Sequence, residues 1–206
     1  MQFLLKHSFK LAIGSLVVLM GIYLYLTYGG SESTPKLPNM QAAPEFTLQD
    51  AVNGGDVNFS DSNGKVRLIY FYWANCPDVC PPTTQLMSQV QDKLIADKKF
   101  GSDVELMSIT FDPVRDTPEA IKKYSEKFHA DYTGWKFLRG DEKYTADLIP
   151  QFKGMMLFKD EKTNEFSHLD LLILVDRDGN VRKYIDGAHE ETMSADSIMK
   201  DIESVM

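Results

Sequence analysis

The chain of 206 residues has a hydrophobic fraction of 43% and a formal charge of −8 at pH 7. This length and composition predict a globular protein with one sizeable core. No cluster of lysine or arginine offsets the negative charge, which argues against a nucleic-acid-binding protein, so no nucleic-acid partner is expected.

The first thirty residues predict a membrane anchor. Residues 11–30 carry no charge and follow Lys6 and Lys10. As a helix this run would rise about 30 Å, enough to cross the hydrocarbon core of a bilayer. The positive flank predicts a cytoplasmic N-terminus and an extracytoplasmic soluble domain, periplasmic or on the outer face. A cleaved signal peptide is the alternative, because Gly29-Gly30-Ser31 is small enough for cleavage.

The remaining chain predicts a linker over 31–43 and one domain over 44–206, after the flank and anchor at 1–30. Apolar alternation or continuous apolar runs predict strands at 45–50, 54–60, 66–72, 104–111, 135–138, 169–175 and 181–185. Helical spacing and capping residues predict helices at 83–98, from about Pro118 to Phe128, at 142–152 and at 193–205. Most of the segment 153–167 is predicted to be a mobile loop, and 176–179 a turn. The order of elements predicts a thioredoxin-like α/β sandwich with a mixed central sheet and an N-terminal β-hairpin.

Cys76 and Cys80 are the only two cysteines, and they lie between the strand at 66–72 and the helix at 83–98. At such a turn, backbone N–H groups and the helix dipole favour thiolate. A structural disulfide here would close a very short loop and stabilise little. A redox dithiol of the thioredoxin type has two intervening residues, not three, and a proline opposite it, whereas this chain has no proline after Pro150. The remaining alternative is a copper site, because thiolate and imidazole suit Cu(I), whereas structural zinc needs four ligands.

A third ligand would come from one of the four histidines. His7 belongs to the flank of the predicted anchor, and His129 follows a helix, where a cation complements the dipole. His168 directly precedes the strand at 169–175, at the end of the sheet that faces the dithiol. We therefore favour His168 as the ligand, with His189 as the rival.

At this point three segments of the sequence resemble the Sco/SenC family. The first is Tyr70-Phe71-Tyr72 followed by Cys76-Pro77-Asp78-Val79-Cys80-Pro81, the second is Asp112 to Pro118, and the third is His168 with Gly179 eleven residues later. The resemblance covers about Pro44 to Val205. It differs at Ser167, where the family usually has aspartate, and at Asn75, where a histidine or similar polar residue is common. These departures leave the ligand set intact but predict altered surroundings for His168.

The resemblance implies a membrane-anchored copper chaperone for the assembly of cytochrome c oxidase. Cys76, Cys80 and His168 would bind copper, as Cu(I), Cu(II) or both, and the two cysteines would also act as a redox dithiol. The implied partner is the oxidase subunit that carries the Cu_A site, with a thiol reductant and another copper chaperone as further partners. The protein would deliver copper, reduce the cysteines of its target, or both. The alternative function is a metal-free thiol-disulfide oxidoreductase, so enzymatic activity stays open.

Overall fold

A computed structural model describes residues 2–28, 37–153, 155–160, 166–187 and 193–206 of the chain. The chain divides into two compact units, Met1–Pro35 and Lys36–Met206. The first contains helix α1 (Gln2–Tyr28), which includes most of the uncharged run. Considering only the described residues, none of the helices is both long enough and apolar enough to cross a membrane. The anchor at 1–30 therefore stays a prediction.

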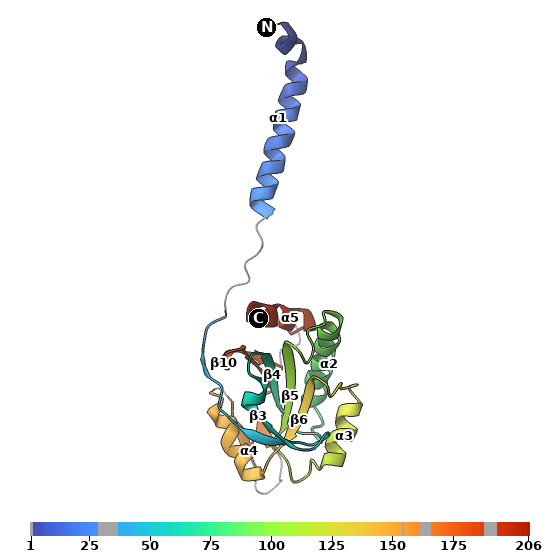
Figure 1. Cartoon of the computed structure of the whole chain (residues 1–206), viewed down its shortest axis with the longest axis vertical. Helices are drawn as coiled ribbons and strands as arrows, with labels where there is room; N and C mark the ends of the chain where they lie inside the picture. Colours follow the sequence, from blue (N-terminus) through green and yellow to red (C-terminus); the bar gives the residue numbers. More distant parts are fainter. Residues whose placement is uncertain (1, 29–36, 154, 161–165, 188–192) are drawn as a thin grey trace. The chain divides into compact units, whose positions relative to one another are not determined.

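The second unit is an α/β domain (Figure 1). Its strands are β1 (Gln41–Ala42), β2 (Thr47–Asp50), β3 (Asp56–Asn58), β4 (Val66–Tyr72), β5 (Val104–Thr110), β6 (Trp135–Arg139), β7 (Leu157–Lys159), β8 (Phe166–His168), β9 (Leu171–Val175) and β10 (Asn180–Asp186). Its α-helices are α2 (Cys80–Ala96), α3 (Pro118–Glu126), α4 (Glu142–Leu148) and α5 (Ala195–Ser204). Short 3₁₀ helices lie at η1 (Phe59–Ser62) and η2 (Ile149–Gln151).

The main sheet has the strand order β1-β10-β9-β4-β5-β6-β2-β3. Strands β4, β5 and β6 run parallel, and β9 pairs with β4 in the antiparallel direction. Strands β2 and β3 form an antiparallel hairpin next to β6. All seven residues of β4 are buried, as expected for a central strand covered on both faces. The structure thus confirms the predicted α/β class, the mixed sheet and the N-terminal hairpin.

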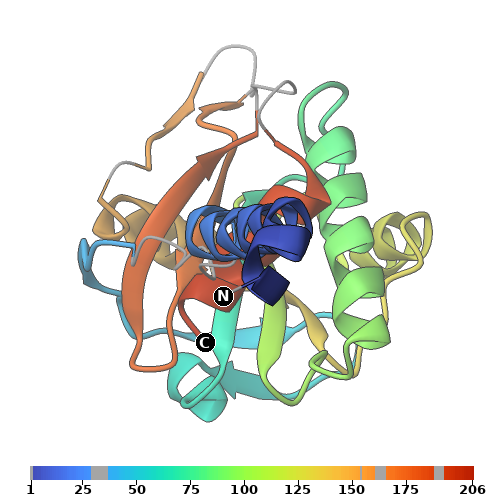
Figure 2. The ribbon, with the colours of Figure 1, turned by 90° about the horizontal axis from the view of Figure 1, so that it is seen from above.

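Two apolar clusters cover the two faces of this sheet. On one face, Leu68 and Tyr70 of β4 belong to a cluster with residues of α2, α3 and α5. On the other face, Ile69 and Phe71 belong to a cluster with residues of α4 and the two 3₁₀ helices. Figure 2 shows α2 running alongside the sheet. Because each fully buried large apolar side chain contributes about 1.5–3 kcal/mol, the first cluster, which includes Cys80, Leu86 and Met87 of α2, holds the start of α2 against β4.

Several element boundaries differ from the sequence prediction. Helix α2 begins at Cys80, three residues before the predicted start, and β1 lies within the segment predicted as a linker. Most of 153–167 was predicted to be a loop, and this is wrong at 157–159 and 166–167, which belong to β7 and β8. Strand β8 pairs with β7 as a separate two-stranded sheet. These strands are three residues long, too short for apolar alternation to reveal them.

Candidate metal centre

The dithiol occupies the connection between β4 and α2. The Cys76 N–H donates to the Trp73 carbonyl at 3.0 Å and closes a turn. The Cys80 N–H, at the start of α2, donates to Cys76 Sγ at 3.5 Å. Both cysteines are free thiols, with Cys80 fully buried and Cys76 half-buried. The pair therefore presents one accessible sulfur and one hidden sulfur.

Two prolines shape the first turn of α2. Pro81 and Pro82 directly follow Cys80. Proline is tolerated in the first turn of a helix because the N–H groups there have no intrahelical acceptor, and its fixed φ suits the helix. The helix can therefore start at Cys80, so the positive end of its dipole lies beside Cys76 and favours negative charge on that sulfur.

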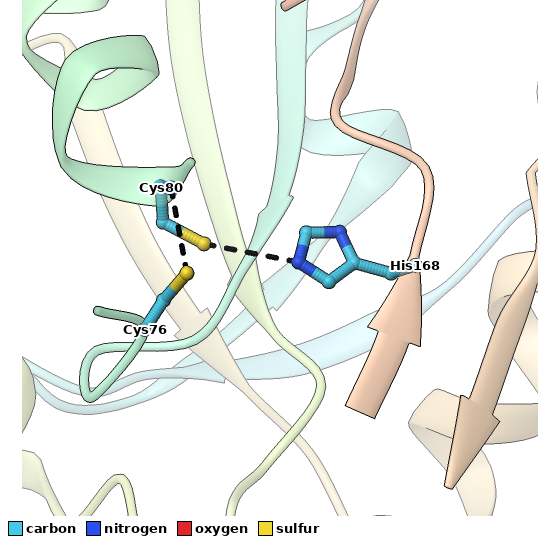
Figure 3. A group of neighbouring side chains, drawn as sticks. All are labelled: Cys76, Cys80 and His168. Carbon is cyan, nitrogen blue, oxygen red and sulfur yellow. Dashed lines mark hydrogen bonds between the residues drawn. The ribbon is translucent and has the colours of Figure 1, made fainter. Parts of the chain in front are cut away.

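His168, at the end of β8, supplies the third potential ligand. Its Nε2 lies 4.0 Å from Cys80 Sγ, and its Nδ1 lies 3.2 Å from the Leu169 carbonyl oxygen. In the neutral imidazole, donation from Nδ1–H to that carbonyl leaves the Nε2 lone pair directed at the sulfurs; in the protonated ring, Nε2–H is the donor on that side instead. Figure 3 shows the three side chains converging from the turn, from α2 and from β8.

The geometry of this group fits a small soft metal ion. The ligand atoms of Cys76, Cys80 and His168 all lie within 4.8 Å of one another. Three donors at bond lengths of about 2.0–2.3 Å around a trigonal ion would lie roughly 3.8 Å apart. The observed spacing therefore needs movements of about 1 Å or less to close on an ion. Two thiolates and one imidazole form a donor set that suits copper.

Aromatic side chains hold the His168 strand against the dithiol turn. The Phe111 ring lies 4.8 Å from the His168 ring and 5.1 Å from Phe166, and Phe166 lies 6.1 Å from Trp73. The Arg115 guanidinium lies 4.4 Å from the centre of the Trp73 ring and 5.6 Å from that of Phe166. Trp73 follows β4 and Phe166 lies in β8, so Arg115 joins the two segments that carry the ligands.

Asp116 fixes the backbone between β4 and Cys76. This fully buried carboxylate accepts hydrogen bonds from the Ala74 N–H at 3.0 Å and the Thr110 hydroxyl at 2.5 Å. Asn75 Nδ2 donates to it at 3.3 Å. Burial raises the pKa of Asp116 to about 6, although the two donors from Ala74 and Thr110 oppose that shift. Asp116 lies in the segment from Asp112 to Pro118 that resembles the family, but nothing in the sequence pattern indicated this bond to the dithiol turn.

The two thiols differ in acidity. The pKa of Cys76 is lowered to about 4, mainly by a hydrogen bond from Cys80. Burial opposes this shift, while hydrogen bonds from His168 and from the backbone at Asp78 lower the pKa further. The pKa of Cys80 is raised because it shares its proton with Cys76 and is buried. Burial lowers the pKa of His168, but its hydrogen bonds to Cys76 and to the Leu169 carbonyl raise it overall. Cys76 is therefore the thiolate of the pair, and Cys80 keeps its proton.

The structure brings together the three predicted ligands, whose role stays a prediction. His129 is exposed and is not part of the group, while the side chain of His7 and all of His189 lie outside the described residues. Asp170 was not among the predicted site residues, and it accepts hydrogen bonds from Tyr70 and Thr83 beside Cys80. An acidic residue directly before the apolar run 171–175 was the available signal.

Comparisons with known proteins all find similarity to one family. The model of the SCO1/SenC family matches residues 35–206. The SCO1 protein homolog of Bacillus subtilis is 30% identical over 89% of this chain and 92% of its own length. The crystal structure of a SCO1/SenC family lipoprotein from Bacillus anthracis is 26% identical, with a TM-score of 0.73 over 83% of this chain and 98% of that chain. The structure of Bradyrhizobium japonicum ScoI with copper bound is 26% identical, with a TM-score of 0.65 over 80% of this chain and 99% of that chain. These neighbours confirm the thioredoxin-like form of the fold.

Proposed function

The chain belongs to the SCO1/SenC family, and from this premise we propose that it binds copper through Cys76, Cys80 and His168 during the assembly of cytochrome c oxidase. The observation that carries the proposal is the convergence of these three ligand atoms within 4.8 Å. The copper-bound ScoI of Bradyrhizobium japonicum and the solved structure of BsSco, described as a member of a family of cytochrome c oxidase assembly proteins, support it.

In this role copper is cargo for the Cu_A-bearing subunit of the oxidase. The half-buried Cys76 sulfur lines a surface pocket together with Trp73, Pro77 and His168. A partner's cysteine could therefore approach from the Cys76 side while Cys80 stays covered. Exchange of thiolates around one ion transfers the metal without releasing it to water. Another copper chaperone would supply the ion, and a thiol reductant would keep the pair reduced.

A copper titration tests this proposal. The reduced protein is titrated with Cu(I) against a competing chelator, beside the variants His168→Ala and His129→Ala. His129 is an exposed histidine outside the ligand group and serves as the matched control. We expect the parent and the His129→Ala control to bind one copper per chain with the same affinity. His168→Ala should lower the copper affinity by more than the 10- to 100-fold that is typical when a residue behind a metal ligand is lost. Equal binding by both variants, or no binding by the parent, would refute the site.

A second function is favoured by the unequal acidity of the two thiols. A thiolate at Cys76, whose pKa is about 4, beside a protonated Cys80 suits thiol-disulfide exchange. Cys76 would attack a disulfide of the target and form a mixed disulfide. Cys80 would then lose its proton and displace the second target thiol, so the target is reduced by two electrons and the pair becomes a disulfide. If the metal-free His168→Ala protein still reduces a generic disulfide, the dithiol works without copper.

We also place the domain outside the cytoplasm, tethered by residues 11–30. The uncharged run and its preceding lysines support this orientation. Cys76 offers a direct test because it is the more accessible of the two thiols. A membrane-impermeant maleimide should label Cys76 in intact spheroplasts, and Cys76→Ser should abolish the label. Labelling only after lysis would contradict the orientation.

A further inference from the structure

The backbone carbonyl of Leu169 is the hydrogen-bond acceptor beside the His168 ring. His168 Nδ1 lies 3.2 Å from this oxygen. A carbonyl oxygen only accepts hydrogen bonds, so this contact is a hydrogen bond when Nδ1 carries the ring proton. The neutral ring then keeps its lone pair on Nε2, which lies 4.0 Å from Cys80 Sγ. The position of one backbone oxygen therefore determines which ring nitrogen is free to bind a metal.

Asp170, the residue after Leu169, is held by three hydrogen bonds. It is buried, and its Oδ1 accepts a hydrogen bond from the Tyr70 hydroxyl at 2.6 Å. Its Oδ2 accepts one from the Thr83 hydroxyl at 2.7 Å, and its own carbonyl accepts one from the Gly187 N–H at 2.7 Å. These donors lie in β4, in α2 and directly after β10. Because the Leu169 carbonyl and the Asp170 nitrogen share one planar peptide group, the three bonds limit the movement of that oxygen.

The other contacts around the Leu169 carbonyl give weaker support. The Leu169 side chain is exposed, and its N–H donates to the Met156 carbonyl at 3.4 Å, which is longer than a typical N–H···O bond. Strand β8 belongs to a two-stranded sheet, and two strands alone are marginally stable in water. The Phe111 ring lies 4.8 Å from the His168 ring but has no oxygen that could select one of its nitrogens. Asp170 is therefore the firmest anchor next to this carbonyl.

The space around the Asp170 carboxylate requires a glycine at position 187. A Cβ atom at Gly187 would lie 2.0 Å from Asp170 Oδ2 and 2.9 Å from Thr83 Oγ1, closer than Cβ atoms approach their neighbours in proteins. The φ angle of Gly187 is not positive, so alanine would bring this clash without backbone strain. Gly187→Ala therefore displaces the carboxylate while Asp170 itself stays unchanged.

We propose that Asp170 is a positioning residue for the copper ligand His168: it holds the Leu169 carbonyl in place, which keeps the ring proton on Nδ1 and leaves Nε2 free for the metal. The proposal deepens the copper-binding function proposed above and rests on it. A group that receives the second ring N–H of a metal-bound histidine fixes the tautomer and the ring orientation. Here a backbone oxygen receives that proton, and Asp170 acts one residue further along the chain by fixing the oxygen.

NMR of the ring nitrogens tests the proposal in the full-length, reduced, metal-free protein. In a neutral imidazole, the nitrogen that carries the proton and the nitrogen with the lone pair have clearly separated ¹⁵N shifts. The spectra are recorded at a pH where the ring is neutral, and the His168 signals are identified by their loss in His168→Ala. We expect the proton on Nδ1 in the parent and a measurable shift of the proton toward Nε2 in Asp170→Ala. A parent ring with its proton on Nε2, or an unchanged ring in Asp170→Ala, would overturn the proposal.

Three further variants separate position from charge and from folding. In Asp170→Asn the amide oxygen can accept from the Tyr70 hydroxyl and the amide N–H can donate to the Thr83 hydroxyl oxygen, so the tautomer should stay that of the parent. Gly187→Ala should move the proton in the same direction as Asp170→Ala. If Asp170→Asn moves the proton as far as Asp170→Ala does, Asp170 acts through its charge, and the proposal is wrong.

Asp50 provides the matched control for loss of a buried carboxylate. It lies in β2, which β5 and β6 separate from β4 in the sheet, and it accepts hydrogen bonds from residues 52 and 53. Asp50→Ala should cost stability but leave the His168 tautomer unchanged. An equal tautomer shift in Asp50→Ala would show that any destabilised domain releases the ring, and Asp170 would have no special role.

Copper affinity completes the test and is measured separately. Asp170→Ala should lower the Cu(I) affinity 10- to 100-fold, the range typical when a residue behind a metal-bound histidine is lost, and Asp170→Asn should lower it little. If the tautomer moves as expected but the parent binds no copper, the proposed function fails and the positioning of His168 by Asp170 stands. If the parent binds copper through His168 and the tautomer does not move in Asp170→Ala, the positioning role alone fails.

Discussion

Replacement of Asp116 by asparagine should make the protein less sensitive to pH. Asp116 is fully buried, and burial raises its pKa to about 6 from an ordinary 3.8. A folded-state pKa above the unfolded value means that the native state holds the proton more tightly. Stability from this group is therefore complete at low pH and is lost as the pH rises from about 4 to about 6. Asparagine does not titrate, so the variant lacks this loss.

The size of the effect follows from the shift. One unit of pKa corresponds to 1.36 kcal/mol, so a shift of about two units corresponds to about 3 kcal/mol. Asp116 has no exposed surface, so solvent screening removes little of this energy. The free energy of unfolding of the parent, relative to that of Asp116→Asn, should fall by about 3 kcal/mol between pH 4 and pH 7.

Urea unfolding of the reduced, metal-free protein measures this difference. Trp135 is fully buried in the core, so tryptophan fluorescence reports its unfolding. Other groups that titrate in this range are common to both proteins and cancel in the comparison. If the difference in the free energy of unfolding between the parent and Asp116→Asn stays constant between pH 4 and pH 7, the reasoning is refuted. That result would mean that the hydrogen bonds from Ala74 and Thr110 fully offset the cost of burying the charge.

Three further predictions concern the site itself. Alkylation of Cys76 should keep its rate through neutral pH and slow only near pH 4, and Cys80→Ser should raise that midpoint, since the hydrogen bond from Cys80 is the main cause of the low pKa. Arg115→Ala should weaken copper binding roughly tenfold in a chelator competition, because cation–π contacts with Trp73 and Phe166 contribute about 0.5–2 kcal/mol each. Unchanged binding would show that β8 holds its place without these contacts. Copper at 100 times its dissociation constant should raise the free energy of unfolding by about 2.7 kcal/mol. A chelator should reverse this gain, and Cys80→Ser should largely lack it.

The elements of the main sheet could be predicted because their residues repeat with the period of their structure. The continuous apolar run of β4 indicated a central strand, and the order of strands and helices indicated a mixed sheet. The two strands β7 and β8 could not be predicted in this way, because a three-residue strand provides too few positions to show a period. The start of α2 was set too late because the apolar spacing begins only after Pro81 and Pro82, which the first turn accommodates.

The three ligand candidates could be named because cysteine and histidine are few in this chain and have distinctive chemistry. Their supporting residues could not be found in the same way. Asp116 has the sequence appearance of a helix cap, yet Thr117 caps α3 and Asp116 holds Ala74, 42 positions earlier in the chain. Asp170 is joined to Tyr70 across 100 positions. Such long-range hydrogen bonds arise from strand pairing and helix packing, which local patterns do not encode.

Pro81 and Pro82 also decide what the start of α2 can attract. The first turn of a helix ordinarily offers several free N–H groups to phosphate, sulfate or carboxylate ions. Here two of those groups are missing, the Thr83 N–H is bonded to the Val79 carbonyl, and the Cys80 N–H is directed at sulfur. Oxygen anions in solution are therefore attracted by the positive end of the helix dipole but find few hydrogen-bond donors there. The Cys76 sulfur has both the attraction and a hydrogen bond. The prolines thus make this helix terminus selective for sulfur over hard anions before any metal arrives.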